Sequence, residues 1–268
     1  MACKTPSEII EVMGAACVVK TGLPASKTLV SAALAGAYVG FGGLLAILVG
    51  KGIAPTVVDG VSYNGWSRLV FAGVFPVGLM LVLIAGAELF TGNTAVLVPG
   101  VLAGRAPLRG LLRNWALVYA GNLAGSLVLA YFLAYLTGLC AGEPYVSAVR
   151  AIARDKTNLA FMTAFWRAVG CNWLVCLAIW LTAAADDVAG KVLAVWFPIM
   201  AFVGIGFEHS VANMFFIPTG MLYGAGIGVD RFLVHNLLPV TLGNIVGGAF
   251  FVGVLQWWLN GRRAAAPR

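Results

Sequence analysis

Long stretches without charged residues are the feature that most limits what this chain can fold into. A helix needs about 20 consecutive apolar residues to cross a hydrocarbon core about 30 Å thick. Four stretches meet this need as one helix each, the last of them with His235 as its single ionisable group: 28–50, 114–142, 168–185 and 232–261.

Two further stretches are too long for one crossing. The first, at 69–104, has 36 residues, and Glu88 is its one acidic or basic residue. The second, at 192–229, has 38 residues, and its acidic and basic residues are the neighbours Glu208 and His209. Straight helices of that length would measure about 54–57 Å. We therefore predict two spans broken by irregular backbone, which survives at membrane depth only where protein buries it or water lines it.

The composition agrees with lipid as the solvent for this chain. Hydrophobic residues make up 61% of its 268 positions and charged residues 10%, whereas soluble domains carry roughly 25% charge. The 17 lysines and arginines are scattered over the loops and both ends, which argues against a nucleic-acid-binding face. The five cysteines show no metal-ligand or redox spacing, so neither a metal nor a cofactor is predicted.

These patterns predict an all-α integral membrane protein with six transmembrane helices, of which helices 2 and 5 are broken. We divide it into an N-terminal amphipathic segment at 1–27, a six-span transmembrane domain at 28–260 and a tail at 261–268. The loops on the side of the termini hold ten of the 17 cations, which weakly favours cytoplasmic termini.

An internal repeat links the two broken spans. The pattern Gly-x-Glu followed by Asn93 recurs 120 residues later with Asn213, and a Gly-Asn-x-x-Gly pattern around Asn122 recurs around Asn244. Because each half has an odd number of spans, the halves must be inverted relative to each other, at about 28–142 and 161–260. Inverted repeats with paired discontinuous helices indicate a substrate path near the midplane.

The polar residues at the breaks leave two roles open. Glu88 and Glu208 could accept hydrogen bonds from backbone N–H groups freed by the breaks, or one of them could bind a cation or relay protons. We favour the first role because it explains the repetition, and Asn93, Asn213 and the asparagines of the Gly-Asn pattern fit a similar capping role.

His209 breaks the symmetry, because Leu89 occupies its position in the first half. A neutral histidine that can gain charge near physiological pH is our main candidate for the chemistry of the path. Phe75, Phe90 and Phe202 lie near the breaks, where they either pack the core or narrow a pore.

Four segments resemble the formate/nitrite transporter family. They are LFTGNT at 89–94, CNWLVCLAIW at 171–180, FEHSVANMF at 207–215 and LPVTLGN at 238–244. The resemblance covers residues 5–260 and implies an aquaporin-like fold, a homopentamer in a lipid bilayer, and a separate pore in each protomer for small monovalent anions.

The resemblance also implies roles for individual residues. His209 would be the central pore histidine, Asn172 would hold its other ring nitrogen or the substrate, and Thr91 would offer its hydroxyl to the anion. Lys156, in the loop before the fourth span, would draw anions into a vestibule. Phe75 with Phe202 would form one constriction and Leu79 with Phe90 the other, while Glu208 and Asn213 would brace the second break.

We therefore expect a channel or transporter for nitrite or formate with histidine-linked proton coupling, and not an enzyme. Bicarbonate or hydrosulfide conduction, or an aquaporin-like channel for neutral solutes, are the alternatives. The expected location is a bacterial cytoplasmic membrane, or a chloroplast envelope if a transit peptide has been removed.

Overall fold

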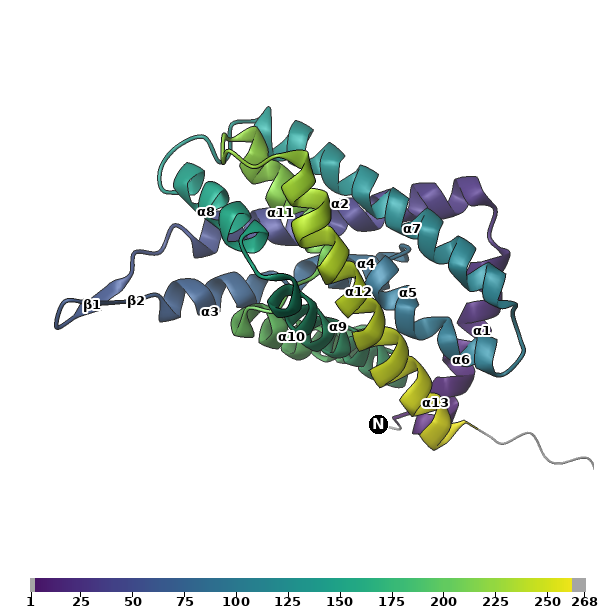
Figure 1. Ribbon diagram of the computed structural model, residues 1–268. Coiled ribbons are helices and arrows are strands. Elements are labelled where there is room, and N and C mark those ends of the chain that lie inside the picture. The colour runs from purple at the N-terminus through teal and green to yellow at the C-terminus, as the bar shows by residue number, and fades with distance from the viewer. Residues whose placement is uncertain (1–2, 262–268) are drawn as a thin grey trace, which may run out of the picture.

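Six helices long and apolar enough to cross a membrane form the body of the computed structural model, which describes residues 3–261. They run side by side across Figure 1. Their elements are α2 (Ala25–Gly50), α3 with α4 (Gly65–Val74, Val77–Ala85), α7 with the π-helical η1 (Leu108–Val128, Leu129–Tyr135), α9 (Phe161–Ala184), α10 (Val188–Ile205), and η2, α12, η3 and α13 (Arg231–Leu237, Leu238–Ile245, Val246–Val254, Leu255–Asn260). The prediction of six membrane-spanning helices is confirmed.

The second and fifth spans each stop at a glycine in the left-handed region. Gly86 has φ 82° and Gly206 has φ 90°, a conformation that costs little only for glycine. At both ends the next N–H closes a Schellman-type bond, from Ala87 to the Val82 carbonyl and from Phe207 to the Phe202 carbonyl. The chain then starts new short helices, namely α5 (Phe90–Val96) with α6 (Val98–Leu102), and α11 (Ser210–Leu222).

These short helices occupy the middle of the protein. Every residue of α5 is buried, and so is every residue of α11 from Ser210 to Gly220. Glu88 with Leu89 and Glu208 with His209, which lead into these helices, are buried as well, so protein can satisfy the backbone groups there.

A helix precedes each half of the repeat. The first is α1 (Pro6–Gly22), capped by Thr5 and Glu8 in a capping box, and the second is α8 (Tyr145–Thr157). Figure 1 places α1 at the end of the bundle near the N-terminus and α8 at the opposite end, as inverted halves require. The prediction that Lys156 lies in a loop is wrong, because the segment buries Val149 and Ala153 on one helical face and forms a helix.

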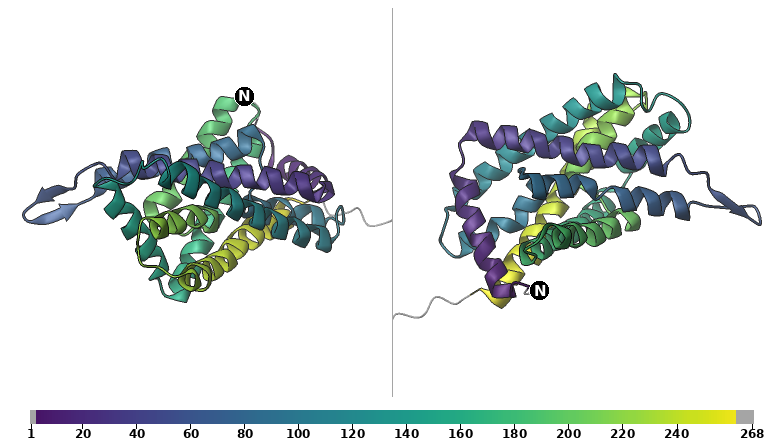
Figure 2. Two further views of the ribbon diagram at one scale, coloured as in Figure 1. Left: turned by 90° about the horizontal axis from the view of Figure 1, so that it is seen from above. Right: turned by 180° about the vertical axis from the view of Figure 1, so that it is seen from behind.

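The N-terminal segment lies across the ends of the spans, as the right-hand view of Figure 2 shows. Its buried face includes Ile9, Met13 and Cys17, spaced four residues apart, whereas Val18 and Val19 are exposed. Of the predicted tail at 261–268, all residues but Gly261 lie outside the described part.

Close approach of small residues joins the spans within each half. A Cβ on Gly125 in α7 would collide with the Ala33 carbonyl of α2, and a Cβ on Gly247 in η3 would collide with the Val169 carbonyl of α9. Such contacts are typical of helix packing in membranes, where close approach replaces the hydrophobic driving force.

One hairpin departs from the all-α prediction. Strands β1 (Thr56–Val58) and β2 (Val61–Tyr63) pair antiparallel and project from the bundle (Figures 1 and 2). Asp59 and Gly60, with φ 51° and 75°, make the turn, since two-residue hairpin loops favour positive φ at both positions.

Candidate functional site

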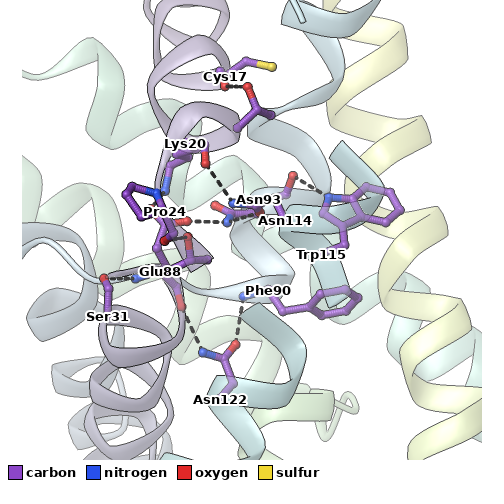
Figure 3. A network of polar contacts seen from close by, with 12 residues as sticks. Cys17, Lys20, Pro24, Ser31, Glu88, Phe90, Asn93, Asn114, Trp115 and Asn122 are labelled. Carbon is purple, nitrogen blue, oxygen red and sulfur yellow. Dashed lines mark hydrogen bonds and ion pairs between the residues drawn. The ribbon is translucent and has the colours of Figure 1, made fainter. Parts of the chain in front are cut away.

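A single asparagine holds each helix break together. In the first half the Asn122 side chain accepts from the Phe90 N–H at 2.9 Å and donates to the Glu88 carbonyl at 2.9 Å (Figure 3). It also donates to the Ala32 carbonyl at 2.8 Å. An amide side chain can accept from one strand of backbone and donate to another at the same time. It therefore replaces both kinds of hydrogen bond that the break removes.

The second half repeats this arrangement with Asn244. Its side chain accepts from the Ser210 N–H at 2.9 Å and donates to the carbonyls of Glu208 and Ala168 at 3.0 and 2.9 Å. Both asparagines are fully buried. Bridging of broken backbone by these two residues agrees with the sequence expectation.

The glutamates have a different role from the one that we favoured. Glu88 accepts from the Lys20 ammonium at 2.6 Å and from the Asn93 amide at 2.7 Å, and Asn93 also donates to Asn114 at 2.9 Å (Figure 3). The Glu88 N–H itself donates to the Ser31 hydroxyl. The carboxylate thus binds side chains, while Asn122 and Ser31 bind the backbone groups of the break.

The same side-chain network recurs around Glu208. Its carboxylate accepts from Lys156 at 2.9 Å and from Asn213 at 2.7 Å, and Asn213 donates to Asn236 at 2.8 Å. Asn236 in turn donates to the backbone carbonyl of Lys156. The glutamate side chains are 9% and 5% exposed, so each lysine supplies the partner that a buried carboxylate needs.

His209 links the two halves through Thr91. Its Nδ1 accepts from the Ala212 N–H at 3.0 Å, and its Nε2 lies 2.9 Å from the Thr91 hydroxyl oxygen. Because Nδ1 accepts, the proton of the neutral ring sits on Nε2 and is donated to Thr91. The Thr91 hydroxyl hydrogen then remains free to donate to another acceptor.

Asn172 contacts Thr91 rather than His209. Its amide nitrogen lies within hydrogen-bonding distance of the Thr91 carbonyl at 3.1 Å, the Thr94 hydroxyl at 2.9 Å and the Asn244 carbonyl at 2.6 Å. Within residues 3–261 its side-chain oxygen has no hydrogen-bond partner. Asn172 therefore positions the segment that carries Thr91.

Two vestibules approach this centre from opposite ends. The one beside α8, here the α8 vestibule, encloses about 420 Å³, and its lining includes Lys156, Phe75, Phe202 and His209. The one beside α1, the α1 vestibule, encloses about 340 Å³. Its lining includes Lys20, Leu89 and Gly92.

Aromatic rings close the inner end of the α8 vestibule. Phe75 and Phe202 meet edge to face at 6.0 Å between ring centroids, and Phe202 stacks on His209 at 5.9 Å. Leu79 and Phe90 are also buried, but neither lines either vestibule, and Phe90 packs against Tyr119 of α7.

Comparisons with known proteins place this site in a family. The family model described as "Formate/nitrite transporter" matches residues 7–258. The chain belongs to the formate/nitrite transporter family. This transporter is 48% identical to a "Probable formate transporter" of Methanothermobacter thermautotrophicus, over 95% of this chain and 96% of that one. It is 40% identical to "Formate channel BtFdhC" of Bacillus thuringiensis, with 94% of both chains covered.

Two solved structures match the transporter over most of its length. One, described as an "FNT family ion channel", gives a TM-score of 0.81 at 36% identity and covers 94% of this chain and 98% of its own. The other, a "Pentameric formate channel with formate bound", gives 0.72 at 35% identity and covers 88% and 97%. The family assignment and the broad prediction of a transport protein are confirmed.

The sequence analysis did not assign several polar residues to the site. Lys20, Ser31 and Lys51 were counted only as loop charges or span residues, yet Lys20 and Ser31 hold the first break and Lys51 lines the α8 vestibule. In the second half Arg167, at the equivalent position, accepts the Glu208 N–H through its carbonyl. Because every residue has a backbone carbonyl, the sequence does not indicate which one acts as this acceptor.

Proposed function

We propose that this transporter carries formate, with nitrite as a second substrate, and that each anion crosses together with a proton. Formate comes first because the named relatives and the ligand-bound structural neighbour are formate proteins. The observation that carries the proposal is the hydrogen-bonded pair of His209 and Thr91 between the two vestibules.

The pair supplies an anion-binding donor between the two vestibules. His209 donates to the Thr91 oxygen, which leaves the threonine hydroxyl hydrogen for a carboxylate. Asn172 positions the Thr91 segment by binding its backbone carbonyl.

Proton coupling follows from the second ring nitrogen. A proton added to His209 Nδ1 would face the Ala212 N–H and break that hydrogen bond. The charged ring is then favourable only when an anion lies close enough to offset the loss. Protonation and anion entry therefore promote each other, and the pair can cross together.

Hydrophobic constrictions require such pairing. A bare anion loses much of its hydration free energy between Phe75 and Phe202, which close the inner end of the α8 vestibule. A neutral acid loses far less, so the rings select against an unaccompanied charge.

The assembly and location belong to the same proposal. We place the protein as a homopentamer in a bacterial cytoplasmic membrane, with one pore in each protomer and with α1 on the cytoplasmic side. The pentameric formate channel among the structural neighbours and the cation bias of the loops support this arrangement.

The test is uptake of labelled formate, nitrite and bicarbonate into proteoliposomes at several external pH values. We expect formate uptake to rise as the external pH falls, and His209→Asn to remove this dependence. His235→Asn is the matched control, because it makes the same change at an exposed histidine. Transport of water or glycerol without any anion would overturn the proposal in favour of a neutral-solute channel.

A further inference from the structure

A line of aromatic rings connects the mouth of the α8 vestibule with its buried end. Phe71 stacks on Phe216 at 6.0 Å, Phe216 on Phe75 at 6.1 Å, and the contacts of Phe202 described above continue the line to His209. All five rings line the same vestibule. They form a low-dielectric wall, along which the field of a nearby charge is weakly screened.

Two lysine ammonium groups lie over this wall. The Lys51 nitrogen is 5.4 Å from the centroid of Phe71, and the Lys156 nitrogen is 5.7 Å from that of Phe216. Lys156 is bound to the buried Glu208, which neutralises its charge. Within the described residues Lys51 makes neither an ion pair nor a side-chain hydrogen bond.

The other charged groups of the vestibule do not replace Lys51. Arg68 donates to the carbonyls of Gly204 and Ile205 at the end of α10, so its guanidinium is committed to the helix terminus. Asp155 is exposed at the rim. Among residues 3–261, three cations and two carboxylates line the vestibule. Since Lys156 is paired with Glu208, Lys51 supplies the free ammonium of this set.

Partial burial makes this ammonium a stronger partner for an anion. Removal from water lowers the pKa of Lys51, Asp155 raises it in part, and Arg68 lowers it further. A poorly hydrated cation gains more from a nearby carboxylate than a fully solvated one does.

We propose that Lys51 is the first anion-binding group of the α8 vestibule, which captures a small monovalent carboxylate or oxyanion at the mouth before it reaches His209. In this arrangement Lys156 holds the second helix break through Glu208. The proposal rests on the proposed function for the identity of the anion.

The experiment measures formate uptake against formate concentration for the wild type, Lys51→Gln and Lys51→Arg. At about 10 mM salt we expect Lys51→Gln to raise the half-saturating concentration about fivefold, the effect of one charge a few ångströms away. The maximal rate should stay within about twofold, and Lys51→Arg should restore the wild-type value. At about 500 mM salt the difference should largely disappear.

Lys27→Gln is the matched control. The substitution removes the same charge from the exposed first turn of α2, the helix that ends just before Lys51. Lys27 lines neither vestibule. An unchanged half-saturating concentration in Lys51→Gln would overturn the proposal, as would an equal change in Lys27→Gln.

A second measurement separates this proposal from the proposed function. An amine-reactive reagent is applied to the wild type with increasing formate, and modification of Lys51 and Lys27 is followed by mass spectrometry. Formate should slow the modification of Lys51 alone. If the wild type carries no formate but Lys51 is still protected, the proposed function fails and the capture site stands. If formate is carried and neither measurement depends on Lys51, the capture site alone fails.

Discussion

The asparagine at each helix break can be replaced by leucine, which has the same number of side-chain heavy atoms but no hydrogen-bonding group. Asn244→Leu abolishes three hydrogen bonds of 2.9–3.0 Å in a fully buried site, and it leaves the Ser210 N–H and the carbonyls of Glu208 and Ala168 without these partners. Hydrogen bonds between membrane helices contribute about 0.6–1.7 kcal/mol each. Buried groups left unpaired cost about 1–3 kcal/mol.

These values predict a loss of about 3 kcal/mol in the free energy of unfolding. In a chain of this size the loss lowers the melting temperature by about 6–12 °C. Asn122→Leu should cost about as much, because its three hydrogen bonds at the first break have nearly the same lengths.

The assay is equilibrium unfolding in mixed micelles, followed by tryptophan fluorescence, with thermal melts as a second measurement. Asn260→Leu is the control, since within the described residues the side chain of Asn260 hydrogen-bonds only to Gln256, one turn earlier on the terminal helix, and the change should alter stability by less than about 0.5 kcal/mol. A loss below about 1 kcal/mol in Asn244→Leu would refute the reasoning, as would a large difference between the two breaks.

Three further changes test other parts of the structure. Lys156→Met should lower the free energy of unfolding by about 3–5 kcal/mol, because it leaves the buried Glu208 carboxylate without its cationic partner. Adding Glu208→Gln should recover part of that loss in the same unfolding assay. Gly125→Ala should cost several kcal/mol, since its Cβ would meet the backbone of α2, whereas Gly73→Ala meets open space and should be nearly neutral by melting temperature. The N-cap hydrogen bonds hold the pKa of Glu8 below its ordinary value of 4.5, so this carboxylate stabilises α1 above that value and the stability is lost as the pH falls through the lowered pKa. Amide exchange in the first turn of α1, corrected for intrinsic rates, should therefore accelerate at pH 3 to 4 relative to neutral pH, and an unchanged rate would contradict this role.

The spans and both helix breaks could be predicted because lipid imposes a strict rule on the sequence. A charge inside a span is so costly that Glu88 and Glu208 mark irregular backbone by their presence alone. Their repetition then showed that the two breaks are related.

The α8 helix could have been found from its spacing of apolar residues. Val146, Val149 and Ala153 recur every three to four positions, which is typical of a helix with one buried face. The search for charge-free stretches passed over it because this segment contains four charged residues between 150 and 156. The hairpin likewise carried a signal, since Asp59-Gly60 between apolar residues favours a two-residue turn.

The pairing of lysines with glutamates could not be predicted in this way. Lys20 and Glu88 are 68 positions apart, and Lys156 and Glu208 are 52 apart. Only the docking of α1 and α8 against the broken spans brings each pair together, and that docking depends on tertiary packing rather than on local sequence.

The polar network of each break is closed within its own half and the helix that precedes that half, and this affects the chain during its synthesis. Lys20, Ser31 and Asn122 all precede or closely follow Glu88, so the first half can neutralise its carboxylate and cap its backbone before the second half has left the ribosome. Newly inserted helices thus need not hold an unpaired charge in the bilayer during synthesis. The contact between Thr91 and His209 needs both halves and forms last, so the anion path is completed only when biogenesis ends.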